Sequence, residues 1–427
     1  MHLAMAGDVL VCVIVGVSIF LMLIRPGGIS EVYWVGTGVV LLLTMRLIDI
    51  RLALQGAGKA LDVCFFLIGM MLLCELAREH GVFDWLSAVA VQKADGSCMR
   101  LFALVYALGT IVTIFLSNDA TAVVLTPAIL VAVRKAKVEP LPYLFVCALI
   151  ANAASFVLPI SNPANLVVFH NAMPPLAKWL AAFGVPCLFS VGATFLVLRW
   201  FFRAELSHTI DQETVVPALS WNGKLVLRST TAMIGVLLVT SSLGKDLGLP
   251  TCLSALAVIT LICVKERRNP SIFLHGISWS TLLLVVGLFI MVDAVENVGV
   301  MRYTREWLAW VQSLGLTAGV LVTGFGIGVA NNLVNNLPLG LIVGGTLHAA
   351  QASSHIIDAA MIGIDLGPNL SIAGSLATIL WLIALRKEGL DVGFWDFLKV
   401  GVLVMPVTLF ASLLGCVAMH LLSTAFR

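Results

Sequence analysis

The sequence predicts an all-α membrane protein in which ten transmembrane helices and two re-entrant helical hairpins form two inverted-topology repeats. Three observations support this fold class. Apolar residues make up 60% of the 427 residues and charged residues only 11%, against about 25% charged residues in soluble domains. Residues 68–82 (IGMMLLCELAREHGV) and 286–300 (VGLFIMVDAVENVGV) align about 218 positions apart. Each copy is followed by apolar segments that polar residues and prolines interrupt.

Apolar stretches of about 20 residues, the length that crosses the hydrocarbon core of a bilayer, define the predicted spans. The first has no basic region before it and no small-residue cleavage site after it, which favours a retained span over a signal peptide. The spans fall at 8–24, 31–45, 60–78, 140–170, 179–202, 224–243, 247–264, 279–298, 354–385 and 398–424, and the hairpins at 101–133 and 314–347.

The distribution of Lys and Arg predicts the topology. With both hairpins re-entrant, 17 Lys and Arg residues fall on one side and eight on the other, and the positive-inside rule then places both termini outside the cell. RKAK (134–137) becomes cytoplasmic and HAAQASSH (348–355) external, so the repeats are inverted. The predicted divisions are N-terminal helices (1–59), a first repeat (60–203), a cytoplasmic linker (204–223), connecting helices (224–278) and a second repeat (279–427).

Polar residues interrupt the first hairpin at FLSNDATAVVLTP (115–127), where Ser117, Asn118, Asp119 and Thr121 lie at the turn. Two half-helices that meet there would leave backbone amides and carbonyls free to bind a small polar solute or an ion. An ionisable group at membrane depth is a functional candidate, so we expect Asp119 to bind a proton or a cation. The alternative is a helix cap that satisfies amides of the return helix.

The crossing that follows, NAASFVLPISNPANLVVF (152–169), cannot be a continuous helix. Pro159 and Pro163 each remove a backbone hydrogen bond and clash with the preceding turn. Asn162 and Asn165 then either line the same cavity or only stabilise the unwound backbone.

The second half repeats this pattern in NNLVNNLPLG (331–340) and GIDLGPNLSIAGSLAT (363–378). Its tip carries neutral residues where the first tip carries an acid, so we expect a chemically lopsided site. Asp365 precedes a predicted break at Gly367-Pro368 and is a candidate for proton coupling or for capping the next helix. The candidate lining residues of this half are Asn335, Asn336, Asn369, Ser371 and Ser375.

Glu75 and Asp293 occupy equivalent places in the two repeats and complete the candidate proton-coupling acids. Arg78 lies near Glu75 and Glu296 near Asp293, so an interfacial position or a local ion pair is the alternative. His170, His348 and His355 lie near predicted loops and are interpreted as surface residues.

Several function classes are excluded. The net charge of +2 offers no basic face for nucleic acid, and no zinc, phosphate-loop or catalytic-triad spacing is present. The nine cysteines contain no CxxC and lie mostly in apolar runs, so we interpret them as small hydrophobic residues rather than disulfides or metal ligands. Duplicated halves with broken helices instead indicate a secondary transporter that binds its solute between the halves, without a cofactor.

SNDATAVVLTP, ISNPANLVV, NNLP and above all GIDLGPNLSIAGSLATILWLIAL resemble the ArsB family of arsenite efflux proteins (arsenical pump membrane proteins), in the ion-transporter superfamily. The resemblance covers nearly the whole chain. It implies alternating-access export of trivalent arsenic and antimony, as neutral hydroxides, in exchange for protons across a prokaryotic inner membrane. In some systems an ArsA-type ATPase is a partner. By family pattern the site comprises Ser117, Asn118, Asp119, Asn162, Asn335, Asn336, Asp365, Asn369 and Ser375.

Three alternatives stay open. A sodium–proton antiporter or another ion carrier on the same scaffold would suit Asp119 and Asp365. A dicarboxylate carrier is disfavoured, because no Lys or Arg lies centrally. A passive metalloid channel differs from a carrier only in that it cannot move solute uphill. A membrane enzyme is the least favoured alternative, because no nucleophile with a base or a metal cluster recurs in the apolar spans.

Overall fold

The protein is all-helical, as its sequence predicts. The computed structural model describes residues 2–169, 173–210, 216, 218–299 and 301–425. Within these ranges the only β-type pairing is an isolated bridge between Ser97 and Thr209. His170 and residues 211–215 and 217 of the predicted linker lie outside the described residues.

The helices of the first half end close to the predicted limits of the spans. The crossing predicted to be broken is split into α9 and α10, and the return arm of the first hairpin contains a π-helical turn at Thr121–Leu125. The helices are α1 (His2–Ile24), α2 (Glu31–Thr44), α3 (Ile50–Lys59), α4 (Leu61–Glu79), α5 (Val82–Lys93), α6 (Cys98–Phe115), α7 (Asn118–Ala120), α8 (Thr126–Lys135), α9 (Leu141–Ala153), α10 (Pro163–Val168) and α11 (Leu176–Phe201).

The second half has the same order of elements. Its broken crossing is split into α18 and α19, with two 3-10 turns between them at Gly367–Leu370 and Ile372–Gly374. The helices are α12 (Trp221–Ser242), α13 (Gly248–Glu266), α14 (Trp279–Asn297), α15 (Met301–Ser313), α16 (Gly315–Val334), α17 (Asn336–Ala349), α18 (Ser354–Leu366), α19 (Leu376–Lys387) and α20 (Phe394–Ala425).

Matching elements of the two halves have matching lengths. Helices α4 and α14 contain 19 residues each, and Leu61 and Trp279, their first residues, are 218 positions apart. Helices α9 and α18 contain 13 residues each. This agreement supports the predicted duplication, whereas the inverted orientation of the copies in a membrane stays a prediction.

Among the described residues, seven helices are long and apolar enough to cross a membrane, or eight if α3 and α4, bent by 43°, form one span. Two of the seven, α6 and α16, are first arms of the predicted hairpins. Each broken crossing consists of helices that are individually too short to be counted among these seven. The count of ten crossings and the re-entrant nature of the hairpins therefore stay predictions.

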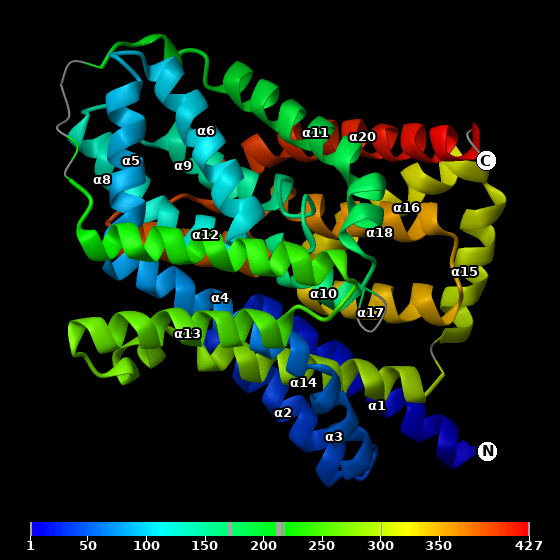
Figure 1. The fold of residues 1–427 in the computed structure, drawn as a ribbon. Helices are drawn as coiled ribbons and strands as arrows, with labels where there is room; N and C mark the ends of the chain where they lie inside the picture. The colour runs from blue at the N-terminus through cyan, green and yellow to red at the C-terminus, as the bar shows by residue number, and fades with distance from the viewer. Residues whose placement is uncertain (1, 170–172, 211–215, 217, 300, 426–427) are drawn as a thin grey trace.

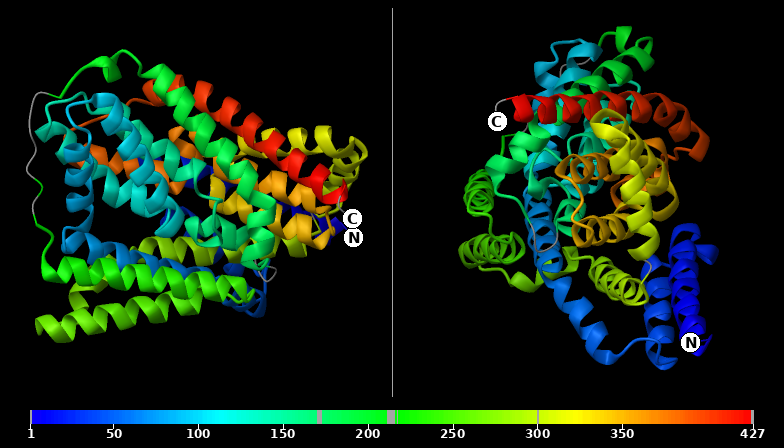
Figure 2. Two further views of the ribbon diagram at one scale, coloured as in Figure 1. Left: turned by 45° about the horizontal axis from the view of Figure 1, so that its top comes forward. Right: turned by 90° about the vertical axis from the view of Figure 1, so that its right-hand side faces the viewer.

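The broken segments lie at the centre of the molecule. Figure 1 shows α11 and α20 along one side, α1, α13 and α14 along the other, and α10, α17 and α18 between them. In the right-hand view of Figure 2 the N-terminal helices α1–α3 lie at the lower edge, well away from α20 in the upper part. Each hairpin packs on the broken crossing of the other half, since α17 contacts α10 and α8 contacts α19.

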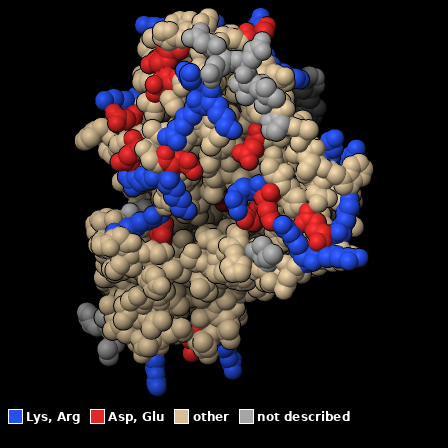
Figure 3. All heavy atoms as spheres, turned by 90° about the vertical axis from the view of Figure 1, so that its left-hand side faces the viewer, with Lys and Arg blue, Asp and Glu red and all other residues tan. Residues whose placement is uncertain are grey.

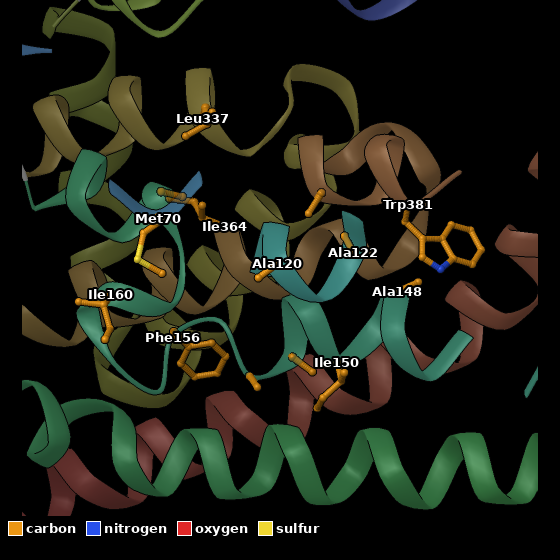
Figure 4. Packing of buried hydrophobic residues seen from close by; sticks show 14 of the residues in the cluster. Met70, Ala120, Ala122, Ala148, Ile150, Phe156, Ile160, Leu337, Ile364 and Trp381 are labelled. Carbon is orange, nitrogen blue, oxygen red and sulfur yellow. The ribbon is translucent and has the colours of Figure 1, made fainter. Parts of the chain in front are cut away.

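Side chains from both halves fill the interior between these elements (Figure 4). Ala120 and Ala122, near the first hairpin tip, are small enough for the helices to approach closely, and both are buried. Trp381 of α19 is also fully buried and donates a hydrogen bond from Nε1 to the carbonyl oxygen of Leu144 in α9, 3.1 Å away. The halves therefore share one core.

Charged side chains gather on one end of the molecule, the end where α5 and α8 lie in Figure 1 (Figure 3). Both chain termini lie at the opposite end. The two termini thus share one face, and its placement outside the cell remains the prediction of the positive-inside rule.

Candidate substrate site

The first hairpin tip is built by two short polar side chains. Ser117 adopts a φ of 143°, which ends α6 and lets the chain reverse. Its Oγ accepts a hydrogen bond from the amide of Ala120 at 3.3 Å, and Asn118 Oδ1 accepts one from the amide of Asp119 at 2.9 Å. Ser117 is therefore the cap of the return helix. Asp119 is half-buried, and no described residue donates a hydrogen bond to its carboxylate.

A cavity of about 230 Å³ lies beside this tip. Ser117 and Asp119 supply polar groups on one wall, and α4 supplies the facing wall. Glu75 and Arg78 lie at the exposed part of the lining, where Arg78 donates hydrogen bonds to both carboxylate oxygens of Glu75 at 2.8 and 2.5 Å. The ion pair expected as the alternative for Glu75 is thus present. The remaining lining residues are Phe66, Leu67, Met70, Met71, Cys74, Ala120, Val123, Val124, Pro163, Gly276, Ser278, Thr281, Leu376 and Leu380.

Sulfur-containing residues line the α4 wall of the cavity. Met70, Met71 and Cys74 all contact it. Thioether and thiol groups are soft ligands, so this wall differs in chemistry from the oxygen groups of the hairpin tip. The sequence pattern did not identify these residues, although GMMLLC lies inside the duplicated motif. The packing of α4 against the hairpin tip is a tertiary contact, which the pattern does not reveal.

Asp365 lies at the centre of a network between the two broken crossings. It is fully buried and accepts hydrogen bonds from Ser155 Oγ at 2.6 Å and from Asn162 Nδ2 at 2.8 Å. Asn162 Oδ1 in turn caps α10 by accepting from the amide of Ala164 at 3.0 Å. Asp365 thus lies beside the unwound backbone of the other half and is not among the residues that line the cavity.

The network continues through a second group of buried polar residues. Asn152 Nδ2 donates to Asn369 Oδ1 at 3.0 Å, and Ser375 Oγ donates to Asn152 Oδ1 at 3.3 Å. Ser375 also caps α19 by accepting from the amide of Thr378 at 3.1 Å. Asn369 and Ser375, both predicted to line the site, therefore join the halves in this structure.

Asn165 and Thr121 have local structural partners. Asn165 Nδ2 donates to the carbonyl oxygens of Ser155 and Leu158 at 2.9 and 3.1 Å, so it stabilises the unwound backbone of its own crossing. The hydroxyls of Thr121 and Thr113 are 2.8 Å apart and join the two arms of the first hairpin. Asn165 Oδ1 has no partner among the described residues, so its place in the substrate site stays a prediction beside this structural role.

The second hairpin tip is less polar than the first. Asn335, with a φ of 74°, occupies the place of Ser117 and donates to the carbonyl oxygen of Ala373 at 3.2 Å. Leu337, 218 positions after Asp119, lines a cavity of only about 30 Å³ together with Asn335. Asn336 is buried beside it, with no partner for its Oδ1 among the described residues. The two tips therefore differ in polarity, with a leucine at the position equivalent to the acid.

The remaining two predicted residues lie apart from the cavity. Ser371 donates to Asn332 Oδ1 at 2.7 Å. Asp293 is buried and accepts a hydrogen bond from Lys59 Nζ at 2.7 Å, which ties α14 to α3. The sequence pattern did not identify Lys59 as a partner of Asp293, because Lys59 lies just before the predicted span 60–78.

Comparison with known proteins supports a transporter fold. The model of the CitMHS family, described as citrate transporter, matches residues 19–370. An arsenical pump membrane protein of Yersinia enterocolitica is 27% identical over 358 residues, covering 81% of this chain and 83% of that protein. One of Escherichia coli is 25% identical over 408 residues, covering 93% and 95%. The crystal structure of the Alcanivorax borkumensis YdaH transporter has a similar fold, with a TM-score of 0.57, 14% identity and coverage of 87% and 89%.

Proposed function

The chain belongs to the CitMHS citrate-transporter family, and we propose that within this family it exports trivalent arsenic and antimony, as neutral hydroxides, in exchange for protons. Its similarity to proteins named arsenical pumps supports the substrate class. The observation that carries the proposal is the charge balance of the cavity beside Asp119.

That charge balance disfavours citrate. Arg78 is the only cationic residue lining the cavity in the described part of the chain, and Glu75 neutralises it. A citrate anion would therefore meet the Asp119 carboxylate without a compensating cation, and like charges at close range repel. An uncharged hydroxide has no such conflict.

The two walls of the cavity suit a metalloid hydroxide in different ways. Ser117 and the Asp119 carboxylate can exchange hydrogen bonds with the hydroxyl groups of arsenous acid in place of water. Met70 and Cys74 present soft sulfur atoms to the arsenic or antimony centre. The same wall would be of little use to sodium, which is a hard cation.

Asp119 is the proposed coupling acid, since it is the only carboxylate in the cavity that lacks a cationic partner among the described residues. In this scheme a proton binds Asp119 from outside, and the neutralised site releases the metalloid before the proton is discharged inside. At about 100 mV each inward proton supplies roughly 2.3 kcal/mol. That free energy sustains an outward solute gradient of about fifty-fold, because about 1.4 kcal/mol corresponds to a factor of ten.

Alternating access would move the halves against each other around this cavity. The buried network of Asp365, Asn162 and Asn152 supports that scheme, because it offers polar contacts across the halves that a rearrangement can exchange. Asp365 remains a second candidate for proton coupling.

The sodium–proton antiporter is the second candidate function, and the unpartnered Asp119 carboxylate is what favours it. Uptake into inverted membrane vesicles with an acidic interior separates the two. We expect uphill accumulation of arsenite and antimonite, driven by the proton gradient, and none of citrate. Sodium-driven proton movement without arsenite uptake would instead establish the exchanger. Arsenite entry that only equilibrates across the membrane would establish a passive channel.

A further inference from the structure

A second cluster of chemically active side chains lies outside the cavity lining, where α18 and α20 pack together. Asp358 on α18 and Cys416 and His420 on α20 present ligand atoms that all lie within 4.8 Å of one another. Asp358 and Cys416 are buried, and His420 is 21% exposed. We propose that this cluster, completed by His355, is a binding site for a divalent transition metal of the zinc type.

The spacing of the residues suits a metal site between two helices. His355 and Asp358 are three positions apart, and Cys416 and His420 are four apart, so each pair lies on one face of its helix. The rings of His355 and His420 are 5.8 Å apart, centroid to centroid. One thiol, one carboxylate and two imidazoles form a donor set that zinc accepts in tetrahedral geometry.

The partners already present agree with this assignment. His420 Nε2 lies 2.9 Å from Asp358 Oδ2, so a hydrogen bond holds these two ligands together. Ser353 Oγ lies 3.2 Å from His355 Nε2. The ring nitrogens of His355 lie outside the 4.8 Å group, so its side chain has to turn to bring Nδ1 to the ion. A polar contact to the second ring nitrogen is the usual way in which a protein orients a ligating histidine.

The cluster lies close to one end of the molecule. Helix α18 begins at Ser354 and α20 ends at Ala425, and both of these ends lie at the end of the molecule that carries the termini (Figure 1). His355 is the second residue of α18, and His420 lies five residues before the last residue of α20, so both half-buried histidines are close to this end. On binding, the Cys416 thiol loses its proton to solvent, the thiolate binds the metal, and the hydrogen bond between His420 and Asp358 is replaced by bonds to the ion.

A bound ion would fix the start of α18 against α20. Asp365 lies near the other end of α18, in the network that joins the halves. The site would therefore stabilise the helix that carries this network, and it is independent of which solute the cavity binds.

Cobalt titration of the purified, untagged full-length protein tests the proposal. We expect the intense visible absorption of tetrahedral Co²⁺ and a thiolate-to-cobalt charge-transfer band, both removed by added Zn²⁺. Cys416→Ser should abolish the charge-transfer band, and His420→Gln and His355→Gln should each weaken binding at least about tenfold. Cys12→Ser and His208→Gln, at positions outside the cluster, serve as controls with unchanged binding.

The histidine variants keep the test informative if the buried Cys416 does not tolerate substitution. The absence of tetrahedral cobalt absorption in the wild-type protein would overturn the proposal. Unchanged cobalt affinity in both histidine variants would overturn it as well.

Discussion

Asp119 and Leu337 occupy equivalent positions at the two hairpin tips, yet one lines a cavity of about 230 Å³ and the other a cavity of about 30 Å³. A carboxylate needs water or a polar ligand, whereas a leucine is stable in a closed apolar contact. Of the two hairpin tips, the one that carries the acid thus lies beside the larger cavity.

Cys74 gives the first prediction at the scale of the residue. Replacement by serine, which exchanges the soft sulfur for a hard oxygen, should raise the KM for arsenite and antimonite about tenfold with little change in maximal rate. The assay is initial uptake into inverted vesicles. Cys263→Ser, a change outside the cavity, is the matched control. An unchanged KM in Cys74→Ser would remove the sulfur wall from the substrate site.

Asp365 gives the second prediction at the scale of the residue. Replacement by leucine leaves the amide of Asn162 without its acceptor, and an unpaired buried donor costs about 1–3 kcal/mol. Ser155 loses less, because its single hydroxyl hydrogen can be donated instead to the carbonyl oxygen of Asn152, 2.7 Å away. Thermal unfolding in detergent measures the loss. Ile364→Leu is the control from the same helix, and equal stability of the two variants would contradict the network.

At the scale of the element, the hairpin tips depend on unusual backbone conformations. Asn335 has a φ of 74°, where a non-glycine residue costs of the order of 1–3 kcal/mol. Asn335→Gly removes that strain and loses one hydrogen bond to Ala373, so we expect stability within about 1 kcal/mol of the wild type. Asn335→Val should be clearly less stable in thermal unfolding, because a β-branched residue tolerates this conformation worst. Equal stability of the two variants would show that the tip is not held in this geometry.

The contact between α17 and α10 depends on a glycine. A Cβ at Gly344 would lie 2.5 Å from the carbonyl oxygen of Val168 and 2.8 Å from its Cα, and this backbone cannot move aside cheaply. We therefore expect Gly344→Ala to cost about 1–3 kcal/mol in unfolding free energy and to impair transport. Gly326→Ala, with nothing within 4 Å of the added atom, is the control. If both variants behave alike, the close packing of hairpin and broken crossing is not required.

At the scale of the whole molecule, each hairpin rests on the broken crossing of the other half, so neither repeat is complete alone.

The shared face of the two termini gives a testable topology. Alkaline phosphatase fused after residue 427 should be active, and green fluorescent protein fused there should be dark, if the termini are external. Fusions within the linker 204–223 should give the opposite pattern. Equal signals at both places would contradict the inverted arrangement.

Much of this architecture could be predicted from the sequence, because lipid imposes long apolar segments and prolines mark their breaks. The limits of α4, α14 and the two split crossings fall within a few residues of the predicted ones. The contacts between these segments could not be predicted. The pairing of Asp365 with Asn162, the pairing of Asp293 with Lys59 and the sulfur wall of α4 all depend on how distant segments pack.

The most direct test of the account measures proton movement during transport. Arsenite is added to inverted vesicles that contain a pH-sensitive dye and an acidic interior, for the wild type and for Asp119→Asn. We expect arsenite to accelerate alkalinisation of the interior in the wild type, and Asp119→Asn to abolish this response while arsenite still binds. If Asp119→Asn vesicles release protons on arsenite addition as the wild type does, Asp119 is not the coupling acid.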